Sequence, residues 1–181
     1  MRAAVIYWSK TGNTERVAHT IVEGLQSAGV EVTVRQAEEA DDLDWLAYDL
    51  ICLGFPAYRW HPPQPMDKLL IKKFAQYRSA GQIRVGAPAV PGRRAVIFCT
   101  YSGPHTGIRE AIPAALYAGQ FFEHLGVTVL GEWYIVGEFH GDAEASTQGR
   151  LGDVRGRPND EDLATVRQNL EHVLRHTQAT S

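Results

Sequence analysis

The sequence contains little cysteine and no long hydrophobic run. Its two cysteines, Cys52 and Cys99, are too few for a disulfide framework, and both lie in apolar segments, so we expect reduced residues of the core. No apolar stretch is long enough to span a bilayer, and no signal peptide is recognisable. These absences predict a cytoplasmic protein that does not associate with a membrane.

The chain also lacks a strong charge of either sign. Its 18 lysines and arginines oppose 21 aspartates and glutamates, which gives a formal net charge of −3 and argues against nucleic acid as a partner. Hydrophobic residues make up 44% and charged residues 22%, as is usual in globular proteins. We therefore expect a single domain over residues 1–181, with a long loop at about 137–158.

Short apolar segments alternate along the chain with segments of helical periodicity. Strands are predicted at residues 3–8, 30–34, 50–54, 95–99 and 127–136, the last interrupted at Gly131. Helices are predicted before Gly29, at residues 66–77 and 108–125, and after Pro158, with Pro113 near the start of the third or kinking it. This alternation predicts an α/β fold, a doubly wound five-stranded parallel sheet with helices on both faces.

The most informative segment lies between the first strand and the first helix. Backbone N–H groups of a loop at a helix N-terminus converge on one point, side-chain hydroxyls add donors, and the helix dipole favours negative charge. One polar residue is enough to cap a helix, whereas here four flank a glycine directly after a buried strand. We therefore predict a phosphate-binding loop, made of Ser9, Lys10, Thr11, Gly12, Asn13 and Thr14.

Two common phosphate-binding patterns, G-x-x-x-x-G-K-[ST] and G-x-G-x-x-G, are absent from this segment. Residues 5–15 instead read Val-Ile-Tyr-Trp-Ser-Lys-Thr-Gly-Asn-Thr-Glu. This run closely resembles the loop with which the flavodoxin family binds the FMN phosphate. The resemblance extends over nearly the whole chain in element order. It implies a flavodoxin-like fold with strand order 2-1-3-4-5, non-covalently bound FMN, and redox activity.

Ligands of doubly wound sheets bind at the carboxyl ends of the strands, where the strand order reverses. Two more loops are therefore expected at the site. The loop after the third strand offers aromatic rings that suit a planar flavin, although one of them could instead pack on a helix; its candidate residues are Pro56, Ala57, Tyr58, Arg59 and Trp60. The loop after the fourth strand offers hydroxyl and N–H groups for the flavin's pyrimidine edge; its candidates are Thr100, Tyr101, Ser102, Gly103 and His105.

These loops depart in two ways from those of flavodoxin electron carriers. Carriers usually surround the flavin with acidic loops, whereas here one loop has Arg59 and His61 and residues 100–107 contain no carboxylate. A cation in place of these acids raises the reduction potential for transfer of the second electron to the flavin. Arg59 also stands where flavodoxins commonly have a glycine whose peptide flips, and a positive φ costs a non-glycine residue about 1–2 kcal/mol. Both departures favour two-electron chemistry.

Two functions remain open for the chain. The first is an FMN-binding electron-transfer protein that passes electrons to a redox protein partner. The second is an enzyme, an NAD(P)H-dependent quinone or FMN oxidoreductase, because the run from Gly54 to Tyr58 is similar to a segment of flavodoxin-like quinone reductases of the tryptophan-repressor-binding-protein type. No nicotinamide site, catalytic residue or metal site is recognisable in the sequence.

The long loop at 137–158 has two readings. Long ordered loops in compact domains are often functional, so it is either a lid or partner-docking loop, or else a solvated excursion. If the loop folds back over the flavin, His140 becomes a candidate proton donor or substrate contact.

Overall fold

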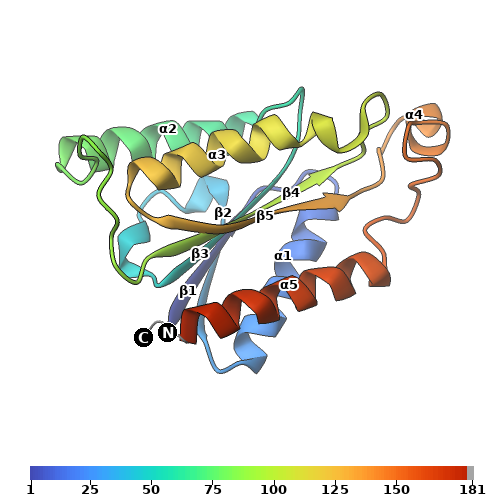
Figure 1. Ribbon diagram of the computed structural model, residues 1–181. Helices are drawn as coiled ribbons and strands as arrows, with labels where there is room; N and C mark the ends of the chain where they lie inside the picture. The colour runs from blue at the N-terminus through green and yellow to red at the C-terminus, as the bar shows by residue number, and fades with distance from the viewer. Residues whose placement is uncertain (179–181) are drawn as a thin grey trace.

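The computed structural model describes residues 1–178, which form a five-stranded sheet flanked by helices (Figure 1). All neighbouring strands pair in parallel, in the order β2-β1-β3-β4-β5. The predicted fold class and strand order are therefore confirmed. The strands are β1 (Arg2–Tyr7), β2 (Glu31–Gln36), β3 (Leu50–Pro56), β4 (Arg94–Tyr101) and β5 (Thr128–Val136).

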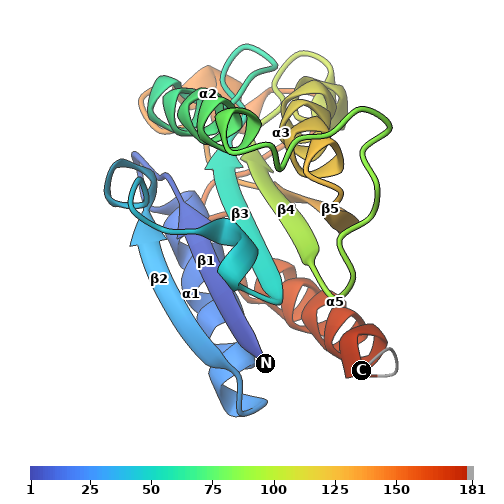
Figure 2. The ribbon, with the colours of Figure 1, turned by 90° about the vertical axis from the view of Figure 1, so that its left-hand side faces the viewer.

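Two helices cover each face of the sheet, as Figures 1 and 2 show. The pair α1 (Asn13–Ser27) and α5 (Asp160–Gln178) packs on one face, and the pair α2 (Gln64–Ser79) and α3 (Ile112–His124) on the other. A short helix, α4 (Ala143–Thr147), lies within the long loop. Three 3₁₀ helices complete the described chain: η1 (Ala37–Glu39), η2 (Trp45–Ala47) and η3 (Gly107–Glu110).

The central strands β1, β3 and β4 are mostly apolar after their first residues, as is usual for strands with both faces buried. In β1, Ala4 and Ile6 face the core under α2 and α3, whereas Ala3 and Val5 face the core under α1 and α5. The cysteines follow the same rule, as one thiol is buried on each face. Burial raises the pKa of the Cys52 thiol to about 12, so this side chain acts as an uncharged core residue.

One predicted element boundary differs in the structure, and two predicted features of the elements are confirmed. The helix predicted at 108–125 begins at Ile112, because residues 107–110 form η3, and Pro113 lies in its first turn, where proline has no N–H to lose. The predicted interruption of β5 at Gly131 is a bulge, at which Ala95 pairs with Val129 but Val96 pairs with Gly131. Helix α5 begins just after Asn159, whose side-chain oxygen accepts from the backbone N–H of residues 161 and 162.

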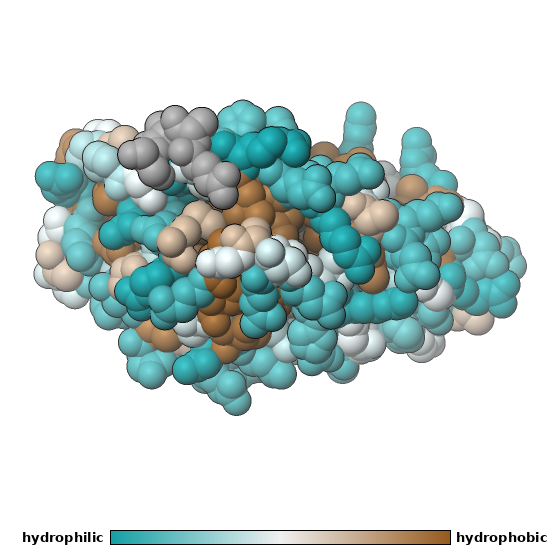
Figure 3. Space-filling model, turned by 90° about the horizontal axis from the view of Figure 1, so that it is seen from below, coloured by the Kyte–Doolittle hydropathy of each residue, from teal (hydrophilic) through white to brown (hydrophobic). Residues whose placement is uncertain are grey.

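The face seen from below in Figure 3 is mostly hydrophilic, with apolar side chains showing in the middle of the view. Large exposed apolar side chains elsewhere include Tyr58, Trp60, Ile71 and Tyr117. Within residues 1–178, no helix combines the length and apolarity needed to cross a membrane.

Candidate functional site

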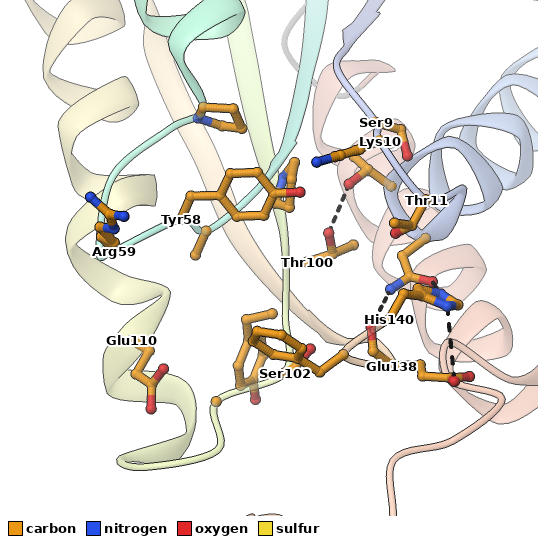
Figure 4. Close-up of a pocket in the computed structure, with 18 of the residues that line it drawn as sticks. Ser9, Lys10, Thr11, Tyr58, Arg59, Thr100, Ser102, Glu110, Glu138 and His140 are labelled. Carbon is orange, nitrogen blue, oxygen red and sulfur yellow. Dashed lines mark hydrogen bonds and ion pairs between the residues drawn. The ribbon is translucent and has the colours of Figure 1, made fainter. Parts of the chain in front are cut away.

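A cavity of about 770 Å³ opens at the carboxyl ends of β1, β3 and β4 (Figure 4). The strand order reverses at this point, because β1 lies between β2 and β3. Four segments wall the cavity, namely the loops after β1, β3 and β4 and the chain that follows β5. All predicted site residues except Gly12 line it: Ser9, Lys10, Thr11, Asn13, Thr14, Pro56, Ala57, Tyr58, Arg59, Trp60, Thr100, Tyr101, Ser102, Gly103 and His105.

The predicted phosphate-binding loop turns directly into α1. Gly12 is the N-cap residue, with a φ of 92°, and its N–H donates to Ser9 Oγ over 3.2 Å. A positive φ at this position favours glycine, so Gly12 shapes the turn without lining the cavity. No described side chain caps the N-terminus of α1. The first N–H groups of this helix therefore remain available to an anion in the cavity.

Thr14, which we predicted as a phosphate donor, also makes a contact across the site. Its side chain is buried, and its hydroxyl lies 2.7 Å from the hydroxyl of Thr100, which is buried as well. Figure 4 shows this bond in the centre of the site. One of the two hydroxyls donates to the other, so the pair connects the first turn of α1 to the end of β4.

The loop after β3 contains a two-residue hairpin turn. Tyr58 and His61 exchange both backbone hydrogen bonds, over 2.9 and 3.1 Å. The residues between them, Arg59 and Trp60, have φ values of 50° and 65°, as in a type I′ turn. Arg59 thus has the positive φ that we expected to be energetically costly for a residue other than glycine. Strain of this kind is typical of functional sites.

The two aromatic residues that we expected beside a flavin, Tyr58 and Trp60, are both partly exposed. Tyr58 makes an edge contact with Trp8 of the first loop, with ring centroids 5.9 Å apart, and Trp60 is 62% exposed. It is His61 that reaches a helix, because its ring lies 4.4 Å from that of Tyr117 in α3. Tyr58 and Trp60 therefore remain available at the cavity.

Replacing Arg59 with glycine is expected to stabilise the protein by about 0.5–1 kcal/mol, because glycine adopts a positive φ without strain but gains entropy in the unfolded chain. The free energy of unfolding measured in urea tests this. Arg84→Gly is the matched control, since Arg84 is exposed in a loop without a positive φ, and it should lower stability slightly. An equal loss of stability in both variants would contradict the proposed strain.

The loop after β4 is held by a carboxylate that the sequence analysis missed. Glu110 of η3 accepts from the backbone N–H groups of His105 and Thr106, over 2.9 and 2.7 Å. It also lines the cavity, so a carboxylate stands beside a loop whose own residues, 100–107, contain none. Its position four residues after Thr106, at the start of a helical segment, was the available signal.

The first residues of the long loop pack against the site, although many of the residues that follow are exposed. Glu138, Phe139 and His140 line the cavity, and the backbone carbonyl of Glu138 accepts from the side chain of Asn13 over 3.0 Å. Ser102 donates from its hydroxyl to the carbonyl of Gly137 over 2.7 Å. The other lining residues absent from our predicted set are Pro62, Pro63, Gln64, Pro104 and Glu110.

The charges of the cavity are mixed. Lys10 and Arg59 contribute cations, and Glu110 and Glu138 contribute carboxylates. Burial raises the pKa of the Tyr58 hydroxyl, and it does so for Tyr101 as well, although Arg157 acts in the opposite direction there. Both phenols are therefore hydrogen-bond donors near neutral pH, not bases. Among residues 1–178, no three His, Cys, Asp or Glu side chains are grouped to hold a metal ion.

Comparison with known proteins relates most of the chain to one family. The family model described as Flavodoxin matches residues 5–162. A flavodoxin from Megasphaera elsdenii is 40% identical over 53 residues, which are 29% of this chain and 39% of that protein. The aligned part thus spans well under half of the relative's length.

Solved structures share the fold at low sequence identity. A flavodoxin from Streptococcus pneumoniae TIGR4 superposes with a TM-score of 0.68 and 16% identity, covering 97% of this chain and 99% of the other. A flavodoxin, WrbA-like protein from Agrobacterium tumefaciens gives a TM-score of 0.60 and 18% identity, covering 99% of both chains. These likenesses concern the fold alone.

Proposed function

The chain belongs to the flavodoxin family, whose members bind FMN, and we propose that it is an FMN-dependent electron carrier that serves a redox protein partner. One observation supports this most strongly. The N-terminus of α1, uncapped by any described side chain, opens into a cavity that three strand-end loops surround. FMN is the cofactor that this arrangement suits.

The residues of the cavity match the parts of FMN. The N–H groups at the start of α1, with the hydroxyls of Ser9 and Thr11, would hold the phosphate, because all of them can donate hydrogen bonds to an anion. Tyr58 and Trp60 offer rings that would border the flavin. The loop after β4 would supply hydrogen bonds to its polar edge. Bound FMN supplies the electron-accepting chemistry, and the protein supplies binding, orientation and electrostatics.

A carrier is favoured over an enzyme by the surroundings of the cavity. Glu110 and Glu138 place carboxylates beside it, which offsets the cationic character predicted from Arg59. Tyr58 and Trp60 are 44% and 62% exposed, so a protein partner could approach the site directly. Arg59 remains the observation in favour of the second candidate, an NAD(P)H-dependent quinone oxidoreductase, because a lining cation suits an anionic dinucleotide.

An anaerobic titration of the FMN-loaded protein with NADH and NADPH separates these two functions. For a carrier, one equivalent of either nucleotide leaves the visible flavin absorption unchanged over minutes, whereas dithionite bleaches it. Free FMN at the same concentration is the control. Bleaching within seconds by one of the nucleotides would contradict the carrier function and identify a reductase.

A further inference from the structure

A histidine of the long loop lies beside the predicted phosphate-binding loop. The Nε2 atom of His140 is 3.3 Å from the side-chain oxygen of Asn13, the first residue of α1. Figure 4 shows His140 and Glu138 on the same side of the cavity as Thr11, whereas Arg59 and Glu110 lie on the opposite side. His140 is therefore placed at the end of the cavity where the phosphate is expected.

Hydrogen-bond acceptors lie on both sides of the His140 ring. The amide nitrogen of Asn13 donates to the carbonyl of Glu138, so the amide oxygen must be the atom that faces Nε2. The other ring nitrogen, Nδ1, lies 3.9 Å from the carboxylate of Glu138. Both ring nitrogens thus face acceptors, and only the imidazolium carries an N–H on each of them.

The other charged groups near His140 are compatible with a positive charge on its ring. Glu138 accepts from the backbone N–H of Gly156 over 2.9 Å and interacts electrostatically with Arg155, which holds its carboxylate in place. Lys10, in the phosphate-binding loop itself, lines the same cavity. The remaining donors of that loop are neutral N–H and hydroxyl groups, so a protonated His140 would add charge where an anion binds.

We propose that protonated His140 is part of the phosphate site and makes FMN binding depend on pH, with Glu138 as its positioning residue. The proposal rests on the FMN site described above and assigns to the long loop a role in cofactor binding. The expected ligand group is a phosphate ester. Riboflavin, which has the same ring system without phosphate, should not respond to His140.

Dissociation constants of FMN and riboflavin, measured by flavin fluorescence at pH 6 and pH 8, test this assignment. His140→Gln should weaken FMN binding about fivefold at pH 6 and less than about twofold at pH 8, relative to the unchanged protein, because histidine changes charge in this interval. Riboflavin binding should stay the same. Free FMN titrates identically in every measurement, so a ratio of dissociation constants between variants at one pH compares the same ligand population.

Two further variants complete the test. His140→Lys keeps the charge at both pH values and should bind FMN at pH 8 more tightly than the unchanged protein. His172→Gln removes an exposed histidine of α5 and should change nothing. Equal effects of His140→Gln at the two pH values, or an equal loss for riboflavin, would overturn the proposal. If the unchanged protein fails to bind FMN, the FMN site itself is refuted.

Discussion

Replacing Thr11 with aspartate is expected to weaken FMN binding at least about 100-fold. The new carboxylate would repel the phosphate in a partly desolvated anion site, at a cost of at least about 2.8 kcal/mol. A tenfold change in the dissociation constant corresponds to about 1.4 kcal/mol. The new carboxylate would also accept hydrogen bonds from the first N–H groups of α1 and so compete with the phosphate. The dissociation constants of FMN and riboflavin provide the measurement. Riboflavin should be affected much less.

The substitution at Thr11 leaves the fold intact for a structural reason. Thr11 is exposed, and an acidic residue just before α1 suits the helix dipole. Thr14 is unsuitable for this test, because its removal would leave the buried hydroxyl of Thr100 without its partner.

Two controls accompany Thr11→Asp. Thr11→Ala removes a single hydroxyl and should weaken FMN binding less than about tenfold. Thr128→Asp places the same charge at the amino end of β5, whereas the cavity lies at the carboxyl ends of the strands. This variant should leave the FMN affinity unchanged. An FMN affinity that Thr11→Asp leaves unchanged would place the phosphate elsewhere.

Gly54→Ala is expected to lower the free energy of unfolding by about 3 kcal/mol, the largest effect on stability that we predict. A Cβ atom at Gly54 would lie 1.9 Å from the ring of Phe98, which is directly opposite on β4. Phe98 is completely buried and cannot move aside without disturbing the core under α1 and α5. Urea denaturation of the variant provides the measurement.

A double-mutant cycle identifies the cause of this loss. Phe98→Leu makes room for the new methyl group at a cost of its own, so the double variant Gly54→Ala/Phe98→Leu should be more stable than the sum of the single effects predicts. Strict additivity would show that the overlap with Phe98 is not the cause. FMN binding should also weaken in Gly54→Ala, because the Gly54 carbonyl accepts from the N–H of Trp8 at the entrance to the phosphate-binding loop.

The parts of the site that were predictable from sequence are those that local patterns determine. The segment from Ser9 to Thr14 joins a buried strand to a helix, so its chemistry and its position could be inferred together. The loops after β3 and β4 follow from a general property of parallel sheets, whose carboxyl strand ends meet at one edge. The strand order itself came from the resemblance to flavodoxins.

The parts that were not predictable depend on tertiary contacts. Glu110 reaches the site only because η3 turns its carboxylate back onto the N–H groups of His105 and Thr106. The approach of residues 138–140 to Asn13 joins segments that are far apart in the sequence. The turn at Arg59 and Trp60, where both residues have a positive φ, contains no glycine that would indicate it in the sequence.

A buried lysine illustrates the same limit in the fold. Lys73 of α2 is completely buried, although lysine normally indicates a surface position. Its ammonium donates to the backbone carbonyls of Asp41 and Leu43 and to the side chain of Gln76, so it anchors the connection between β2 and β3. Burial lowers the pKa of this lysine. No periodic pattern in α2 identifies such a residue.

Titration of the chain of residues 1–181, freed of flavin, with FMN and with riboflavin tests the central claim most directly. Quenching of flavin fluorescence should show saturation at one FMN per chain. The dissociation constant for FMN should be at least about tenfold lower than for riboflavin, because the N-terminus of α1 binds the phosphate. Equal affinity for the two flavins, or no saturable binding of FMN, would contradict the site described here.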